Sequence, residues 1–548
     1  MFLPYDAAGH PSWPRLALGL AVVVVSGMAP GCFPTDNGPE PPQQELYFPT
    51  ALVPSTKGTA LYVVNSDFDL QYKAGTVQAL DLDHIHELIP PLWTVGEGGK
   101  TRESVCASQH LRLQTEAESV LYPGPCGAID VITPPDGLQA IVRSAVSIGA
   151  FAADAQLTVR SDGHGARLLI PVRGDPSLTW IDVDDERADG TTQTFSLECN
   201  QAAANGHCAD DHKAGVDASE NTRNVTMPSE PYSISVGEEG PGGSAVIVSH
   251  QTTGTVSLFQ NTWDVRPSMT FVLAGLPTGV TGTLPFPKPL LARLYPDDYP
   301  YRPGFLLAFR TSAEVDVVRY YDDAAASPSR PFLSRTQRIG ISTNAIGFDS
   351  RSIAIDTRAR ALAESACGDA PKAPASDADY RACLASAAGA PVAAYAANRI
   401  PPTLLVGQTT TSASTYGTDD SVYFYDSVPL SQGPSRVYVG NVWDGAALRT
   451  RVFILCFDAR TLYIYDPDAR AMEAVVQTGR GPSALAFDPN LAAAPQPTVT
   501  NPTKNARYAY LAHFTDSYIG VLDLDMTHST YLSIVATVAT PAAPRESK

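Results

Sequence analysis

Basic residues are scarce in this sequence: 38 Lys and Arg stand against 57 Asp and Glu, which leaves a formal net charge of −19. An acidic excess repels a phosphate backbone, so the composition predicts no nucleic-acid partner. Charged residues are only 17% of the chain and hydrophobic residues are 44%, with 41 Gly and 46 Pro. This apolar content suffices for a large core, and frequent Gly and Pro favour many short strands joined by turns over long helices.

The sequence also lacks an apolar run of the about 20 residues that a transmembrane helix needs. The apolar run 16–26 follows Arg15 and precedes small residues, which is the order of a secretory signal. This segment ends in Ala29-Pro-Gly-Cys32, which resembles the lipobox of bacterial lipoproteins. The resemblance implies that residues 1–31 are removed and that Cys32 carries a lipid. Ordinary cleavage near this point and an uncleaved anchor are the alternatives.

Residues 32–45 are polar and rich in Pro, and we interpret them as a tether that lifts a folded domain off a membrane. Residues 46–540 then form the folded domain, and residues 541–548 form a flexible tail. The lipid and the tether together predict a protein of the cell envelope. We expect it to be anchored in the outer membrane and to face the periplasm or the cell surface.

Six of the eight cysteines fall into three pairs that are close in the sequence. Each pair lies in a predicted loop, where a short cross-link restrains a flexible excursion in an exported protein. The expected disulfides are Cys106–Cys126, Cys199–Cys208 and Cys367–Cys383. Cys456 lies in an apolar strand pattern and is expected to be a buried free thiol. The pairing is a hypothesis, because the sequence does not determine connectivity.

One pattern recurs along the chain: an apolar strand, a polar turn, and a second strand that in most copies ends in Asp. Seven copies occur, at residues 60–66 with 75–83, 167–173 with 178–184, 244–250 with 254–259, 305–310 with 315–322, 403–407 with 421–426, 451–457 with 461–466, and 507–525. Seven such hairpins are typical of radial repetition, because a blade cannot bury both of its apolar faces alone. We therefore predict an all-β fold, a seven-bladed β-propeller. Six or eight blades stay open as alternatives.

Two features of these copies carry a resemblance to a known group. They are the Asp that ends most second strands and the stretch Gly-Pro-Ser-Ala-Leu-Ala-Phe-Asp-Pro at residues 481–489. The copies resemble the YVTN-type repeats of bacterial surface and periplasmic β-propellers over residues 46–540. The motif itself occurs here only as Leu61-Tyr-Val-Val-Asn65. The resemblance implies a propeller fold that also includes lactonase-like enzymes.

Three stretches between strands are too long for turns, and we interpret them as insertions. They span residues 84–138, 185–229 and 356–398, and each contains one of the cysteine pairs. The second is rich in Asp, Asn and Gly. The third is rich in Ala, which predicts two short helices joined by its cysteine pair.

Metal-ligand residue types gather in two places. The first is Cys199, His207, Cys208, Asp210, Asp211 and His212. Structural zinc needs a second tightly spaced pair, so we favour a disulfide with a solvated acidic loop. The second is Asp182, Asp184, Asp185, Glu186 and Asp189, which lacks the alternating ligands of a calcium loop. No cofactor is predicted, and calcium stays open as the alternative.

Catalytic groups are not assigned by the sequence. Ser249-His250 and His513 are candidates, but no Gly-x-Ser-x-Gly motif occurs and the 10 histidines are scattered. Catalytic sites usually concentrate His, Asp and Glu, so we favour a binding or scaffold module for an extracytoplasmic protein or glycan partner. The alternative is a lactonase-like or other hydrolase with a site at the central channel.

The two ends of the propeller each contain a β-prone segment, at residues 47–52 and 531–537. A strand left alone would expose a sheet edge, and propellers usually complete one blade with strands from both termini. We therefore expect one of these segments to pair inside a blade formed mainly by the other end.

Overall fold

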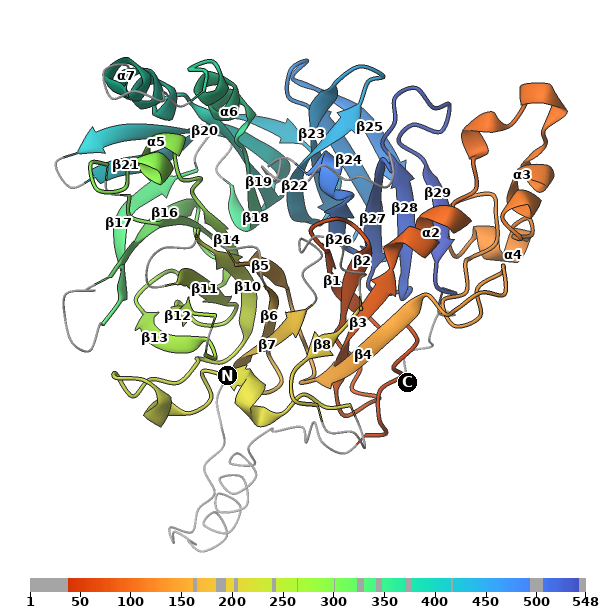
Figure 1. Cartoon of the computed structure of the whole chain (residues 1–548), viewed down its shortest axis with the longest axis horizontal. Coiled ribbons are helices and arrows are strands. Elements are labelled where there is room, and N and C mark those ends of the chain that lie inside the picture. Colours follow the sequence, from red (N-terminus) through yellow and green to blue (C-terminus); the bar gives the residue numbers. More distant parts are fainter. Residues whose placement is uncertain are drawn as a thin grey trace, which may run out of the picture.

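The computed structural model of this chain describes residues 38–160, 165–183, 194–201, 206–238, 243–263, 265–299, 301–322, 330–341, 347–369, 377–414, 417–492 and 506–541. Seven sheets follow one another around a ring (Figure 1). The prediction of a seven-bladed β-propeller is therefore confirmed. None of the helices in this part of the chain is long and apolar enough to cross a membrane. Cys32 and the predicted signal lie outside the described residues.

Each blade is built from consecutive strands. Blade 1 contains β1 (Pro49–Pro54), β2 (Ala60–Asn65), β3 (Gly75–Asp81) and β4 (Val142–Ile148). Blade 2 contains β5 (Gln156–Val159), β6 (Ala166–Val172), β7 (Ser177–Val183) and the short β8 (Leu197–Glu198) and β9 (Lys213–Ala214), which both pair with β7. Blade 3 contains β10 (Pro231–Val236), β11 (Ser244–His250), β12 (Val256–Asn261) and β13 (Ser268–Leu273). Blade 4 contains β14 (Val280–Pro285), β15 (Gly304–Phe309), β16 (Glu314–Tyr321) and β17 (Phe332–Gly340).

The remaining three blades follow the same order. Blade 5 contains β18 (Phe348–Asp356), β19 (Val392–Ile400), β20 (Pro402–Ser414) and β21 (Gly417–Pro429). Blade 6 contains β22 (Pro434–Trp443), β23 (Leu448–Cys456), β24 (Thr461–Asp466) and β25 (Ala471–Gln477). Blade 7 contains β26 (Pro482–Phe487), β27 (Tyr508–His513), β28 (Tyr518–Asp523) and β29 (Ile534–Val538).

The core lies between neighbouring blades, and the strand sequences reflect it. Every residue of β2 and of β27 is buried, since a second strand is covered on both faces by adjacent blades. In contrast, β25 alternates between exposed and half-buried residues at the outer edge of blade 6. Middle strands are therefore continuous apolar runs, which is why the hairpins stand out in the sequence.

The connections between strands alternate between the two faces of the disc, because each blade is an antiparallel meander. We call upper the face that carries the loops from second to third strands and from one blade to the next. The lower face carries the loops from first to second and from third to fourth strands. The first insertion joins β3 to β4 and the third joins β18 to β19, so both emerge on the lower face.

Most of the helices in the described residues belong to the insertions. The first contains α2 (Leu82–Leu88), η1 (Leu92–Thr94), η2 (Glu97–Gly99), α3 (Arg102–Ser108) and α4 (Glu116–Ser119), and it stands out beside β29 (Figure 1). The third contains α6 (Arg358–Ser365) and α7 (Asp377–Ala388), near α5 (Leu290–Leu294) of blade 4. The second insertion contains the short turns η3 (Asp210–His212) and η4 (Ala218–Glu220), and η6 (Pro489–Leu491) lies between β26 and β27. All three predicted disulfides are present, and Cys456 is free and buried, as predicted.

Blade 5 differs from the layout that the sequence pattern suggested. The two predicted hairpin strands are its third and fourth strands, β20 and β21, and its second strand, β19, occupies residues assigned to the third insertion. The β19 sequence Val-Ala-Ala-Tyr-Ala-Ala-Asn-Arg-Ile is rich in Ala, which favours a helix on its own. The segment is nevertheless a strand, because small side chains such as Ala394 and Ala396 are fully buried between the blades.

The prediction of a blade shared between the two termini is wrong. Blade 1 uses only strands from the N-terminal end, and blade 7 uses only strands from the C-terminal end. The first insertion protects the exposed edge of β29 instead. The Ile129 amide donates to Thr537 O (2.8 Å), and the Ala539 amide donates to Ile129 O (2.9 Å). The ring closes by packing, because residues of blades 1 and 7 lie in one buried core, and the covered edge of β29 leaves no strand for another segment to complete.

Candidate functional site

A cavity of about 470 Å³ lies between blades 5 and 6. Its lining comes from both blades and combines charged, polar and aromatic side chains with small apolar ones: Asp356, Arg358, Ala359, Pro391, Ala393, Tyr395, Val406, Gln408, Tyr425, Asp426, Tyr465, Pro467 and Arg470. Asp356 ends β18, and Arg470 lies in the turn between β24 and β25, so the cavity is on the lower face. We call it the tyrosine cleft.

Two tyrosines form the floor of the tyrosine cleft. Tyr395 on β19 and Tyr465 on β24 are each only 2% exposed, and their ring centroids are 6.4 Å apart. No hydrogen bond joins either hydroxyl to another group of the described residues, and neither is among the buried polar atoms without a partner, so both are open to the cavity. Burial raises the pKa of both phenols, so each is a neutral hydroxyl that can donate and accept a hydrogen bond. Tyr425 is 52% exposed and lies at the rim.

Charged side chains of both signs form the walls. The buried carboxylate of Asp356 accepts a hydrogen bond from the Arg358 amide (2.9 Å). The guanidinium of Arg358 lies 3.5 Å from Asp356 Oδ2 and 3.1 Å from Asp468 Oδ1, which belongs to blade 6. Arg358 therefore links the two blades at the start of α6. The cleft thus offers acceptors, donors and aromatic faces within one cavity.

A second hollow, of about 260 Å³, lies at the upper mouth of the central channel. Four phenylalanines line it, and they come from loops of different blades: Phe68, Phe151, Phe457 and Phe514. Phe68 is 51% exposed, and its ring lies 5.2 Å from that of Phe514 and 5.9 Å from that of Phe151. Arg436 of β22 also lines this mouth and pairs with Asp154 (3.3 Å). We call this region the aromatic mouth.

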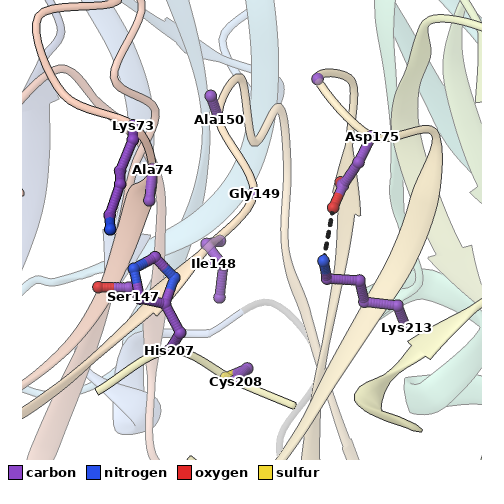
Figure 2. Close-up of a pocket in the computed structure, with 11 residues that line it drawn as sticks. Lys73, Ala74, Ser147, Ile148, Gly149, Ala150, Asp175, His207, Cys208 and Lys213 are labelled. Carbon is purple, nitrogen blue, oxygen red and sulfur yellow. Dashed lines mark ion pairs between the residues drawn. The ribbon is translucent and has the colours of Figure 1, made fainter. Parts of the chain in front are cut away.

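A third cavity, of about 320 Å³, lies on the upper face between blades 1 and 2 (Figure 2). Lys73 and His207 stand beside Ser147 on one side, and on the other side Lys213 pairs with Asp175 (3.0 Å). Both Lys73 and His207 bind Glu40, at 2.5 and 2.9 Å. The cations of this cavity therefore already have partners within the chain.

The residues suggested as zinc ligands do not form a metal site. Cys199 and Cys208 are joined in a disulfide. His207 Nε2 lies 2.9 Å from Glu40, and His212 Nδ1 lies 2.8 Å from the Trp180 carbonyl oxygen. Asp210 pairs with Lys213, and Asp211 accepts from Asn200. Across the described ranges, no group of three or more His, Cys, Asp or Glu side chains could hold a metal ion.

The suggested calcium ligands are only partly described. Asp182 pairs bidentately with Arg167, which explains why an acid ends that strand. The other four, Asp184, Asp185, Glu186 and Asp189, lie outside the described residues.

The suggested nucleophile and bases are buried in blades. The Ser249 hydroxyl accepts from the Ser233 amide, and His250 Nε2 lies 2.8 Å from the Ser257 hydroxyl. Burial lowers the pKa of His250 to about 4 and that of His513 to about 3. Both histidines are fully buried, and neither lines any of the three hollows above.

The sequence interpretation missed the tyrosine cleft. Its floor and rim come from three strands in two blades, and single-sequence spacing does not bring such residues together. One signal was present: consecutive hairpins end in the same dipeptide, Tyr425-Asp426 and Tyr465-Asp466. The two dipeptides do not occupy equivalent positions, because Tyr425 lies on the fourth strand of blade 5 and Tyr465 on the third strand of blade 6, so the repeat alone does not locate the cleft.

No family model matches this chain, and no curated protein matches it in sequence. Solved structures match most of its length at low identity. A protein from Lactobacillus plantarum is 12% identical and covers 80% of this chain and 86% of its own, with a TM-score of 0.38. Hydrazine synthase from Kuenenia stuttgartiensis is 11% identical and covers 88% and 97%, with a TM-score of 0.41.

A periplasmic gluconolactonase from Pseudomonas aeruginosa is 13% identical and covers 79% of this chain and 86% of its own, with a TM-score of 0.37. Likenesses this distant carry no activity to the present chain. The propeller fold is established by the strand order of the chain itself. The resemblance to YVTN-type repeats stays a prediction.

Proposed function

We propose that this chain is a lipid-anchored protein of the cell envelope, tethered through Cys32 in the outer membrane, whose propeller binds a glycan in the tyrosine cleft. One observation carries the proposal. Two tyrosines whose rings are almost fully buried, Tyr395 and Tyr465, present hydroxyls without a protein partner to a cavity of about 470 Å³. Neither hydroxyl is among the buried polar atoms of the described residues that lack a partner, so solvent reaches both in the cavity, and a ligand that bonds them takes the place of that water.

The chemistry of the cleft fits a saccharide better than an apolar ligand. Sugar hydroxyls both donate and accept, and the cleft supplies carboxylates, guanidinium groups, an amide and phenols. The apolar face of a pyranose packs on aromatic rings, and Tyr425 offers an exposed ring at the rim. A concave site with a few convergent polar groups is the usual form of a small-ligand site.

The anchor and the compartment rest on separate support. The lipobox-like segment ends at Cys32, and three disulfides are compatible with an exported protein. Metabolic labelling with a fatty acid tests the lipid directly: the label is expected on the wild type and absent from Cys32→Ser.

Binding is tested on the soluble, oxidised Cys32→Ser chain by calorimetry against a soluble digest of peptidoglycan and other envelope oligosaccharides. Loss of one neutral hydrogen bond is worth about 1 kcal/mol, so Tyr395→Phe and Tyr465→Phe should each weaken binding about fivefold. Tyr531→Phe is the matched control, because its hydroxyl bonds Glu473 outside the cleft.

Three results would contradict the proposal. The chain binds no glycan, or neither cleft variant changes the affinity for a glycan, or the chain binds only a protein partner. Turnover of the bound saccharide, measured in the same samples as released reducing ends, would replace binding by the hydrolase alternative.

A further inference from the structure

The second half of the predicted tether is part of blade 1. Gly38 packs on the backbone of the β2–β3 loop so closely that a Cβ there would lie 2.5 Å from the Tyr72 carbonyl carbon. The Lys73 amide donates to Pro39 O (3.2 Å), and the Lys73 ammonium pairs with Glu40. Because of Lys73 and His207, the pKa of Glu40 is lowered, so its carboxylate stays charged at neutral pH.

The following residues continue the attachment. The Gln43 amide donates to the Ser147 hydroxyl (2.8 Å) on β4. The fully buried Gln78 amide of β3 donates to the carbonyl oxygens of Gln43 and Glu45, both at 2.9 Å. Residues 38–45 are therefore held by contacts to two strands and a loop of blade 1, and by Glu40 to His207 of the second insertion. Their Pro-rich composition marks an ordered docking segment rather than a spacer.

A docked segment shortens the reach of the anchor. Only residues 33–37 separate Cys32 from Gly38. Six steps of a fully extended chain span at most about 20 Å. A lipid on Cys32 therefore keeps Gly38 within about 20 Å of the membrane surface, which is less than the width of a domain of this size.

The point of attachment also selects a face. Gly38 rests on the β2–β3 loop, and the same loop carries Phe68 of the aromatic mouth. That loop is on the upper face, whereas the tyrosine cleft is on the lower face. We infer that the anchored propeller holds its upper face, with the aromatic mouth, against the lipid bilayer and turns the tyrosine cleft away from it. This inference rests on the proposed lipid anchor.

The aromatic mouth has the composition of a surface that contacts a lipid bilayer. Phe68 is 51% exposed, and Phe48, Phe151 and Phe514 surround it with ring centroids 6.2, 5.9 and 5.2 Å away. Exposed aromatic side chains favour the interface between lipid headgroups and acyl chains. An apolar cluster next to a short lipid anchor therefore has a surface to contact without any further partner.

The orientation is tested on vesicles in which the mature, oxidised chain is coupled through Cys32 to a maleimide lipid. Coupling is selective, because six cysteines are in disulfides and Cys456 is buried. Burial raises the pKa of Cys456 to about 11, so its thiol stays protonated and unreactive at pH 7. Brominated lipids in the vesicles then quench tryptophans that lie at the bilayer.

Two tryptophan variants compare the faces. Phe68→Trp places the probe at the aromatic mouth, and Leu362→Trp places it on α6 of the lower face, where Leu362 is 64% exposed. We expect the added fluorescence of Phe68→Trp to be quenched and that of Leu362→Trp to be unaffected. Equal quenching of both probes, or quenching of Leu362→Trp alone, would overturn the orientation.

A linker variant tests the cause. Twenty Gly and Ser residues inserted between Asn37 and Gly38 add a flexible spacer of about 25 Å, which should abolish the quenching at residue 68. Unchanged quenching would mean that the short anchor does not set the orientation. Chemical coupling works whether or not the cell lipidates Cys32, and glycan affinity is measured on soluble protein. Failure of the orientation is therefore distinguishable from failure of the proposed function.

Discussion

The first and third insertions have the same ingredients and different roles. Each combines short helices with a disulfide between sequence neighbours, with separations of 20 and 16 residues. In the first, Ile85, Ile129 and Val131 share one buried core with strands of blade 7. In the third, Tyr380 and Leu384 of α7 form only a small cluster with Leu291 of α5.

The difference teaches that a cross-link does not define what an insertion contributes. Loop closure of these lengths is worth about 3 kcal/mol in the chain-entropy model, so the two disulfides should be nearly equal on that ground. The first insertion covers the edge of β29 and adds to the core between blades 1 and 7, whereas the third supplies Arg358 to a wall of the tyrosine cleft. We therefore expect changes around the first to affect the whole fold and changes around the third to act locally.

Deletion of residues 530–548 should have the largest effect. It removes β29, which pairs with β28 and carries the bridge to Ile129, and so exposes the apolar core shared with the first insertion. We expect insoluble protein or a loss of the cooperative thermal transition, measured by circular dichroism. Deletion of residues 542–548 alone is the control. A truncated protein that melts at the wild-type temperature would show that β29 is dispensable.

The second largest effect is expected from removal of a disulfide, and it should differ between the two insertions. Cys106→Ser with Cys126→Ser should lower the global melting temperature, because both sulfurs lie in the core between blades 1 and 7. Cys367→Ser with Cys383→Ser removes a cross-link between half-buried positions and should leave the main transition nearly unchanged. Increased proteolysis confined to α6 and α7 is expected instead. Equal losses in the two double variants would contradict the comparison.

Low pH should reduce the stability of the fold through His513, which lies where the first insertion covers blade 7. His513 stacks on Tyr518 at 4.0 Å, and Tyr122 of the insertion packs against the same ring. Burial lowers the pKa of His513 to about 3, so between pH 6.5 and 3 only the unfolded state binds the proton. Stability therefore falls as pH falls through this window, by about 2 kcal/mol at pH 5.

The variant His513→Phe keeps a stacked ring and removes this proton. Denaturant unfolding at pH 7.5 and pH 5 should show a smaller difference in the free energy of unfolding for His513→Phe than for the wild type. The same difference in both proteins would mean that His513 does not cause the acid sensitivity.

The smallest expected effects come from removal of one tyrosine hydroxyl at each insertion. Tyr510 is fully buried, donates to Asp488 Oδ1 (2.8 Å) and lies 2.6 Å from His86 Nε2 of the first insertion. Tyr510→Phe should cost about 1–2 kcal/mol, because a buried carboxylate loses a donor. Tyr295→Phe, which removes the bond to Asp377 of the third insertion, should cost less because that pair is partly solvated. Reversal of this order in denaturant unfolding would be evidence against the comparison.

The parts of the fold that the sequence predicted are those set by local chemistry. Continuous apolar strands and Asp-ended turns located the hairpins, and the cysteine spacing located all three disulfides. Two Asp residues at or near strand ends have structural roles: Asp466 accepts two turn amides and pairs with Arg451, and Asp182 pairs with Arg167. In these two blades the acid near the strand end is explained by an ion pair within the blade.

The parts that the sequence did not predict depend on long-range contacts. β19 is rich in Ala and becomes a strand only because neighbouring blades bury it. Residues 38–45 are polar and rich in Pro, and the residues that hold them in place, Lys73, Gln78, Ser147 and His207, lie further along the chain. The tyrosine cleft joins Tyr395 and Tyr465 from different blades, which no pattern within one hairpin reveals.

The central claim is that the propeller binds a glycan in a cleft that faces away from the membrane. The most direct measurement couples the chain through Cys32 to lipid vesicles and asks whether those vesicles sediment with purified, insoluble peptidoglycan. We predict that wild-type vesicles sediment and that vesicles carrying Tyr395→Phe with Tyr465→Phe do not. Vesicles that stay in suspension while the soluble chain binds the same glycan, or sedimentation that survives the double substitution, would contradict the account.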